Sequence, residues 1–159
     1  MQQIGRLTNL QRLRLGHVRI DEDSMQELSQ LTNLRSVSLE ATSINGRGLR
    51  YLTENKELRS LGIGREEFAD ENAEYLLNFP QLTALYLGST TVSDKSMPAI
   101  AELKELRFLE LQGTNITDEG LAKLSALKKL KRLIVRDSKV TQAGVEAIRK
   151  ALPTTKVID

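Results

Sequence analysis

The 159-residue chain contains no cysteine and no tryptophan, and its only histidine is His17. The lack of cysteine excludes disulfides and thiolate metal sites without fixing the compartment. No stretch approaches the ~20 apolar residues of a membrane-spanning helix. The opening residues are polar and lack the apolar core of a signal peptide. We therefore expect no membrane partner, and the cytoplasm is favoured as the location.

The charges and the few aromatic residues exclude further classes of function. The 23 basic and 21 acidic residues leave a net charge of +2, which is no footprint for nucleic acid. Three phenylalanines and three tyrosines are few for a carbohydrate- or nucleic-acid-stacking surface. The pair Gly62 and Gly64 lacks the third glycine of a dinucleotide-binding loop, and no nucleophile elbow or metal-ligand spacing is present. We expect no catalytic activity and no cofactor.

What the chain does contain is a repeat. Leucines recur at an interval of 24 residues that never drifts, and they are Leu10, Leu34, Leu58, Leu82, Leu106 and Leu130. A constant period of this size is typical of a solenoid, in which each unit stacks on the next. A stack of this kind buries one continuous core that no single unit could form.

Each unit changes its own period partway. Apolar residues follow every anchor leucine at three and five positions further on, from Leu13 and Leu15 in the first unit to Leu133 and Val135 in the last. This alternation predicts a short strand with one buried face. In the second half, apolar residues recur every three positions, which predicts a helical turn or a 3₁₀ segment.

The most regular unit, LRFLELQGTNITDEGLAKLSAL over residues 106–127, resembles the leucine-rich repeat, and the resemblance extends over nearly the whole chain. Its I-T-D-E-G-L segment resembles the bacterial and F-box-associated types. The resemblance implies an α/β fold, a right-handed solenoid in a horseshoe arc. It places a parallel β-sheet on the concave face and short helices on the convex face.

Two further columns predict how each unit turns. In the turn that follows the strand, many leucine-rich repeats carry Asn, whereas here the column reads Val18, Thr42, Glu66, Thr90, Thr114 and Ser138. A Thr or Ser hydroxyl supplies part of the same backbone bonding. Residues suited to helix caps form a second column, which comprises Asp21, Asn45, Ser93, Thr117 and Thr141. Acidic residues such as Asp94 and Asp118 follow the cap position, and a negative charge there favours a helix N-terminus.

We expect one domain over residues 1–159, with a partial repeat at 1–7, six repeats over about 8–151 and a C-terminal cap at 152–159. The cap would contain one last short strand at Lys156, Val157 and Ile158. Because the chain opens in the second half of a repeat, we expect a fragment of a longer protein. The alternatives are a short helix that caps itself, or self-association through the uncovered N-terminal edge.

The strand alternation also predicts a binding face. Residues between the buried leucines point to the concave side, which is the usual binding surface of such arrays. The candidate site residues there are Arg12, Arg14, Ser36, Ser38, Ser60, Tyr86, Phe108, Glu110, Arg132, Ile134 and Arg136. The middle of the face is small, and Tyr86, Phe108 and Ile134 form an apolar cluster beside it. The alternative is that these side chains only shield the sheet.

A second candidate surface is the column just before the strand, where basic residues recur. This column contains Gln11, Arg35, Arg59, Thr83, Arg107 and Lys131. It would attract an acidic partner, but Glu57 and Glu105 lie two residues before Arg59 and Arg107. The alternative is therefore a charge-balanced, solvated edge.

The leading hypothesis is a protein-interaction module that binds a protein or peptide on the concave face. Aromatic anchors and arginines favour this hypothesis. One alternative, implied by the resemblance, is the substrate-recognition segment of an F-box-type ubiquitin ligase, although no F-box helices are visible. The other alternative is a structural spacer with no ligand of its own.

Overall fold

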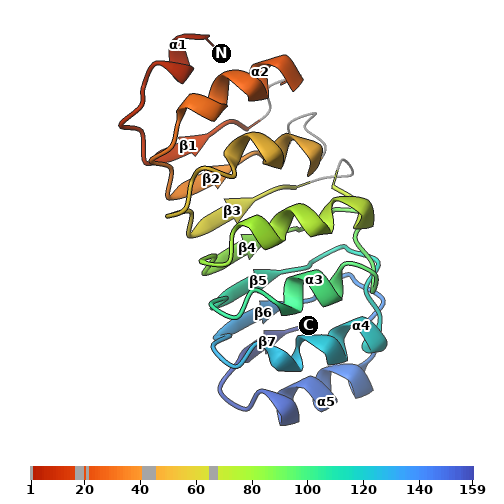
Figure 1. The fold of residues 1–159 in the computed structure, drawn as a ribbon. Coiled ribbons are helices and arrows are strands. Elements are labelled where there is room, and N and C mark those ends of the chain that lie inside the picture. Colours follow the sequence, from red (N-terminus) through yellow and green to blue (C-terminus); the bar gives the residue numbers. More distant parts are fainter. Residues whose placement is uncertain (1, 17–19, 21, 41–45, 65–67) are drawn as a thin grey trace.

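The computed structural model covers residues 1–159, and it describes residues 2–16, 20, 22–40, 46–64 and 68–159. One sheet of parallel strands runs through the molecule, with neighbours in chain order (Figure 1). Its strands are β1 (Arg12–Arg14), β2 (Ser36–Ser38), β3 (Ser60–Gly62), β4 (Ala84–Tyr86), β5 (Phe108–Glu110), β6 (Arg132–Ile134) and β7 (Lys156–Ile158). The predicted solenoid is confirmed, and so is the last strand at residues 156–158.

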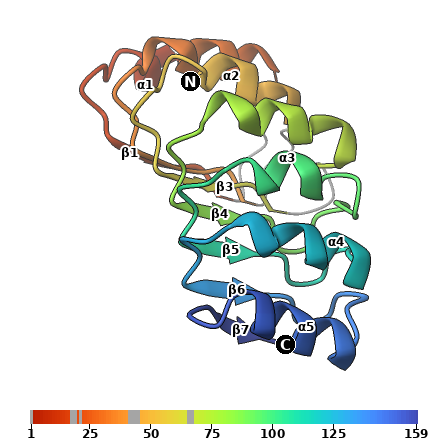
Figure 2. The same cartoon turned by 60° about the horizontal axis from the view of Figure 1, so that its bottom comes forward.

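Short helices connect the strands and lie together on one side of the sheet (Figure 1, Figure 2). The α-helices are α1 (Gln2–Gly5), α2 (Glu22–Glu27), α3 (Met97–Ala101), α4 (Asp118–Lys123) and α5 (Gln142–Ala151). The 3₁₀ segments are η1 (Leu28–Gln30), η2 (Gly46–Leu52), η3 (Asp70–Asn78) and η4 (Leu124–Ala126). Both helix types agree with the spacing of three in the second half of each unit.

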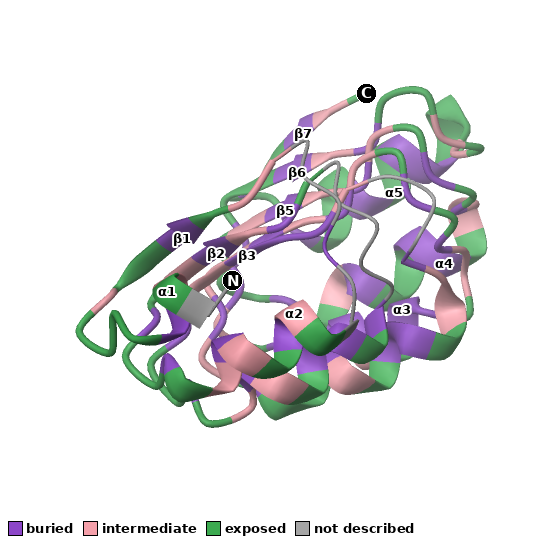
Figure 3. Ribbon diagram, turned by 90° about the horizontal axis from the view of Figure 1, so that it is seen from above, coloured by how far each residue is buried: buried purple, intermediate pink, exposed green. Residues whose placement is uncertain are grey.

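The strands pair in a register of 24 residues, so that each residue lies beside its equivalent in the next repeat. Leu61, for example, pairs with Leu85, and Leu85 pairs with Leu109. These central residues are buried, while the strand residues on either side of them remain partly exposed, except for the buried Gly62. Buried positions line the space between sheet and helices (Figure 3). Burial of these leucines, at roughly 25 cal/mol per Å² of apolar surface, stabilises the stack.

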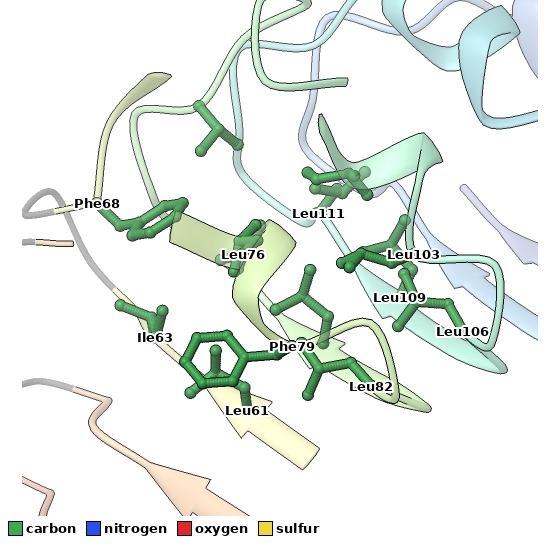
Figure 4. Close-up of a cluster of buried hydrophobic side chains, with 14 of the residues drawn as sticks. Leu61, Ile63, Phe68, Leu76, Phe79, Leu82, Leu103, Leu106, Leu109 and Leu111 are labelled. Atoms are coloured by element: carbon green, nitrogen blue, oxygen red, sulfur yellow. The ribbon is translucent and has the colours of Figure 1, made fainter. Parts of the chain in front are cut away.

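The third repeat fills the same space with different side chains. Phe68 and Phe79 lie in the core around Leu61 and Leu76, and both rings are almost fully buried (Figure 4).

Asn55 occupies a column that is mostly leucine, and it is only 2% exposed. Its side-chain oxygen accepts from Leu34 N at 2.7 Å, and its amide nitrogen donates to Leu52 O at 3.1 Å. The buried amide is therefore satisfied, as burial of a polar group requires.

The turns after β4, β5 and β6 close with a hydroxyl. Thr90, Thr114 and Ser138 donate to the carbonyls three residues earlier, at distances of 2.6–2.7 Å. This confirms that Thr and Ser serve the turn where many repeats have Asn. The residue before each hydroxyl has a positive φ, and at Gly113 it is 66°, a conformation that suits glycine. Val18, Thr42 and Glu66 of the predicted column lie outside the described residues, as do His17, Asp21 and Asn45.

The predicted helix caps are confirmed at Thr117 and Thr141. The Thr117 hydroxyl accepts from Glu119 N at 3.3 Å, and the Thr141 hydroxyl accepts from Gly144 N at 3.4 Å. Each cap satisfies a backbone N–H that has no partner within its own helix. Each hydroxyl also donates a hydrogen bond, because a carboxylate of the preceding repeat faces it.

These carboxylates form a feature that the sequence did not predict, here called the carboxylate ladder. Asp94 accepts from Thr117 N at 2.8 Å and from Thr117 Oγ1 at 2.6 Å. Asp118 binds Thr141 with the same two distances. Asp70 accepts from Ser93 N at 2.8 Å, from Ser93 Oγ at 2.6 Å and from Ser96 Oγ at 2.5 Å. The acidic residues, expected to act on their own helices, thus bind one repeat to the next.

The first repeat forms an incompletely covered edge. Leu10 and Leu15 are half-buried there, whereas their equivalents in the second repeat, Leu34 and Leu39, are buried. Leu7 is 55% exposed. Within the described residues, no helix is long and apolar enough to cross a lipid bilayer.

Candidate binding face

The sheet face that points away from the core is here called the open sheet face. Strand register confirms two rows across it. The first row contains Arg12, Ser36, Ser60, Ala84, Phe108, Arg132 and Lys156. The second row contains Arg14, Ser38, Gly62, Tyr86, Glu110, Ile134 and Ile158.

A third row lies two positions beyond the last residue of each strand from β1 to β6. It contains Gly16, Glu40, Gly64, Gly88, Gln112 and Arg136. All eleven candidate residues therefore lie in these rows on one face. The four arginines are exposed, and the remaining seven are half-buried. The structure thus gathers every side chain that the alternation predicted for this face, while their role in binding stays a prediction.

The aromatic residues of the face form a pair. The ring centroids of Tyr86 and Phe108 are 4.7 Å apart, with an angle of 34° between the ring planes. The guanidinium of Arg132 lies 5.8 Å from the Phe108 centroid, on the next strand. Aromatic pairs and cation–π contacts of this kind each contribute about 0.5–1.5 kcal/mol of stabilisation. The three side chains form an ordered, half-exposed patch.

The predicted apolar cluster is less continuous than the sequence indicated. Glu110 lies between Tyr86 and Ile134 in the second row, because the register pairs it with both. Ile134 instead lies beside Ile158, which is also half-buried. The eleven candidate residues predicted from the sequence stop at the sixth repeat, so Ile158 is not among them. The signal was present, since Ile158 follows Ile134 by one period.

Two carboxylates cover the small residues in the middle of the face. A Cβ atom placed on Gly62 would lie 2.8 Å from Glu40 Oε1, and one placed on Gly88 would lie 3.4 Å from Glu110 Cδ. Glu40 therefore leans from the β2 repeat towards β3, and Glu110 leans from β5 towards the β4 repeat. The room expected above these glycines is flanked by acidic groups from both sides. Glu40 is not among the eleven candidate site residues, although it belongs to the third row of the same face.

The electrostatics of Glu110 reflect this arrangement. Partial burial raises the pKa of the Glu110 carboxyl above its usual value, and the nearby charge of Glu40 raises this pKa further. Arg132 acts in the opposite direction and lowers the pKa of Glu110. A raised pKa means that the ionised form of Glu110 is disfavoured in this setting.

One arginine of the basic column beside the sheet pairs with an acidic residue. Arg59 Nη2 lies 2.8 Å from Glu57 Oε2, as the sequence predicted. Glu105 instead pairs with Lys129 of the next repeat, at 2.6 Å from Nζ. Exposed pairs of this kind contribute at most about 1 kcal/mol. The pair at Arg59 favours the charge-balanced edge over a basic binding stripe, and the choice between the two stays a prediction.

Metal ligands do not gather anywhere in the described residues, where no group of three or more histidine or acidic side chains could hold an ion. The ordered patch on the open sheet face is therefore the candidate site with the most specific geometry. Its chemistry combines aromatic surface, fixed positive charge at the two ends and negative charge in the middle. This combination is suited to recognition of another chain.

Comparisons with known proteins agree with this architecture. The model of the leucine-rich repeat family matches residues 104–125, and no curated protein sequence matches the chain. An internalin of Listeria monocytogenes is 19% identical with a TM-score of 0.73, and the match covers 100% of this chain and 50% of that one. A leucine-rich repeat protein of Leptospira interrogans is 20% identical with a TM-score of 0.63, and the match covers 99% and 45%.

These two structures show the fold, and the chain spans about half of their length. The family match falls on the repeat that is also the most regular in sequence. Domains of this kind are typically binding modules without catalytic activity. The constant period and the seven-stranded parallel sheet give the chain the leucine-rich repeat fold, and the family match at residues 104–125 supports membership of that family.

Proposed function

We propose that this chain is a protein-interaction module that holds a peptide, or an extended segment of a partner protein, on its open sheet face. The observation that supports this proposal best is the ordered pair of Tyr86 and Phe108 with Arg132 beside it. Aromatic residues and arginine dominate the binding energy of protein interfaces. Here they are half-exposed or exposed on the face that the helices do not cover.

Each part of the face has a role in this proposal. Tyr86, Phe108 and Ile134 are apolar anchors for the partner. Arg12 and Arg14 at one end, with Arg132 and Arg136 at the other, add polar selectivity. Their charges are more effective for selectivity and for the association rate than for affinity.

The test is a selection of random peptides displayed on phage, with the purified protein as the target. Affinities of the selected peptides are then measured by fluorescence anisotropy. Phe108→Ala and Tyr86→Ala should each weaken binding by about 2 kcal/mol or more, which is about 30-fold. Leu77→Ala is the matched control, because Leu77 is an exposed apolar residue on η3. Its removal should leave affinity unchanged.

The proposal is wrong if no peptide is selected, or if the selected peptides bind both aromatic variants as tightly as the wild type. Circular dichroism and urea unfolding of each variant separate a lost contact from a lost fold. If the chain is instead a structural spacer with no ligand, which is the alternative left open by the sequence, no peptide should be selected. The F-box alternative stays a prediction.

Pairing of two copies through the N-terminal edge is a second candidate, which the 55% exposure of Leu7 favours. An exposed edge strand such as β1 offers unpaired backbone groups to another chain. Sedimentation of the wild type and of Leu7→Glu tests this. A dimer that the substitution dissociates supports the candidate, and a monomeric wild type excludes it.

A further inference from the structure

The middle of the open sheet face brings two acidic side chains towards each other above backbone that carries no side chains. Glu40 lies over Gly62, with its Oε1 atom 2.8 Å from the position of an added Cβ, and its Cγ lies 3.4 Å from the equivalent position on Gly64. Glu110 lies over Gly88 in the same way, at 3.4 Å from Cδ. The third-row glycines belong to adjacent repeats, whose strands are about 4.8 Å apart. The two carboxylates thus approach each other from opposite sides over two neighbouring repeats, near enough for the charge of Glu40 to raise the pKa of Glu110.

Within the described residues, neither carboxylate forms an ion pair, although Arg132 is near enough to Glu110 to lower its pKa. In the described part of the chain, no ion pair within 4.0 Å involves Glu40 or Glu110. Glu40 has only a weak contact, at 3.5 Å, from the hydroxyl of Ser38. Partial burial and the nearby charge of Glu40 raise the pKa of Glu110 despite the opposing effect of Arg132, so the ionised form of Glu110 is disfavoured there. A positive charge placed between them would relieve this repulsion.

An aromatic ring borders the same point. Tyr86 lies between Gly62 and Glu110 in the second row, and Phe108 fixes its ring by stacking at 4.7 Å. A lysine or arginine side chain carries an apolar stem and a charged head. The stem would lie along the Tyr86 ring, and cation–π attraction would add to the charge interaction with the glutamates.

From this complementarity we infer that the open sheet face selects a partner segment with one lysine or arginine, whose charged group lies between Glu40 and Glu110 above Gly64 and Gly88. The inference rests on the proposed function, and it specifies the chemistry of the partner. A bare metal ion is a poorer occupant, because calcium requires six to eight oxygen ligands and two carboxylates supply fewer.

The ends of the face limit the rest of the segment. Arg12 and Arg14 on one side, with Arg132 and Arg136 on the other, would repel a uniformly basic peptide. The partner segment should therefore have its basic residue in the middle, with neutral or acidic residues towards its ends. Polybasic segments should be selected against.

The test uses peptides selected from the random library on the wild-type protein. They should share one central lysine or arginine. Replacement of that residue by methionine should weaken binding to the wild type by at least about tenfold, which corresponds to ~1.4 kcal/mol. With the variant Glu40→Gln/Glu110→Gln, the same replacement in the peptide should have almost no effect on affinity, because the negative charges that attract the basic residue are gone.

The control variant is Glu74→Gln/Glu146→Gln, which removes two exposed carboxylates from η3 and α5. It should retain the full preference for the basic residue. A third variant, Glu40→Lys/Glu110→Lys, should select peptides with a central acidic residue instead. This reversal gives a gain of binding that a folding defect would not produce.

The outcomes separate the two proposals. If the selected peptides lose affinity on Phe108→Ala but contain no shared basic residue, or ignore the glutamine variant, this inference is wrong and the proposed function stands. If Phe108→Ala and Tyr86→Ala have no effect on the peptides, the proposed function fails, and the inference fails with it.

Discussion

The two ends of the solenoid join their repeats by different means. From η3 to α5, each repeat binds the next through a rung of the carboxylate ladder, at Asp70, Asp94 and Asp118. Between η2 and η3, the equivalent positions are Gly46 and Ala69, which lack the side chains for such a bond. Asn72 lies there instead, and its side-chain oxygen accepts from Ala69 N at 3.3 Å.

The comparison shows that one backbone geometry tolerates two side-chain solutions. Where the ladder has Asp94, the facing residue of the next repeat is Gly120, and an added Cβ there would lie 3.0 Å from Asp94 Cα. Where the earlier repeat has Gly46, the facing residue is the larger Asn72. Small and polar residues have exchanged places across the same contact. At this contact, the repeat therefore constrains the combined volume of the two facing side chains more strictly than their chemical type.

The largest effect should follow from loss of the rung with three hydrogen bonds. Asp70→Ala leaves the Ser96 hydroxyl buried without a partner, and it also removes the acceptor of Ser93 N and Oγ. Bonds to a charged group and buried unsatisfied groups are each worth about 1–3 kcal/mol. We expect a loss of about 2–3 kcal/mol in the free energy of unfolding, measured in urea.

Asp23→Ala is the matched control, because Asp23 is an exposed aspartate on α2. Substitutions at exposed sites of this kind usually change stability by less than about 0.5 kcal/mol. Equal effects of the two changes would show that the ladder does not stabilise the stack.

A smaller effect should come from crowding a rung. Gly120→Ala places a methyl group against the Asp94 carboxylate, and overpacking of this kind costs about 1–3 kcal/mol. Asp94→Ala alone should also destabilise, since it removes two hydrogen bonds to Thr117. The double variant should lose less than the sum of the two, because removal of the carboxylate makes room for the methyl group.

A double-mutant cycle in urea measures this coupling, and strict additivity would contradict the packing described here. The mirrored pair tests the other end of the solenoid. Gly46→Ala would bring its methyl group against the side chain of Asn72, with Cγ only 2.6 Å away. Asn72→Ala should relieve that crowding only in part, because alanine keeps the Cβ atom that is the nearest contact and Phe68 Cδ2 lies 2.9 Å from the same position.

The smallest effect expected near neutral pH is the response to acid. Hydrogen bonds from Thr141 lower the pKa of Asp118. Burial acts to raise the pKa of Asp70, but hydrogen bonds from Ser93 and Ser96 outweigh it and lower this pKa overall. The unfolded chain then binds protons more readily than the folded one. The contribution of these groups is present above the unfolded aspartate value near pH 4 and is lost as the pH falls below it.

Urea midpoints at pH 7, 5, 4 and 3 measure this loss. Asp70→Asn/Asp118→Asn should be less stable than the wild type at pH 7, yet its stability should decline less towards pH 3. Parallel declines of both proteins would show that other carboxyl groups cause the acid sensitivity.

The sequence predicted the apolar framework because its signal repeats in every unit. Leu34, Leu58 and the later anchors are buried as the period required, and Thr114 closes its turn as expected. The carboxylate ladder escaped prediction for a physical reason. Asp94 has the position of a first-turn helix acid, and that local role hides a partner 23 residues further along the chain.

The candidate face shows the same division. Strand alternation was enough to place Tyr86 and Phe108 side by side on the open sheet face. Alternation does not say which way a long side chain leans across its neighbours. The approach of Glu40 towards Glu110 depends on the absence of side chains at Gly62 and Gly88, and only the three-dimensional structure shows it.

The nearest-neighbour character of the ladder also has a mechanical consequence. A pull on the two ends of the solenoid would load its coils in series, so that every contact between coils carries the same force. Among the contacts from η2 to α5, the contact at Gly46 and Ala69, which has no carboxylate bond, should yield first under tension. The repeats from Asp70 onward would then separate from the first two repeats while they remain joined to one another.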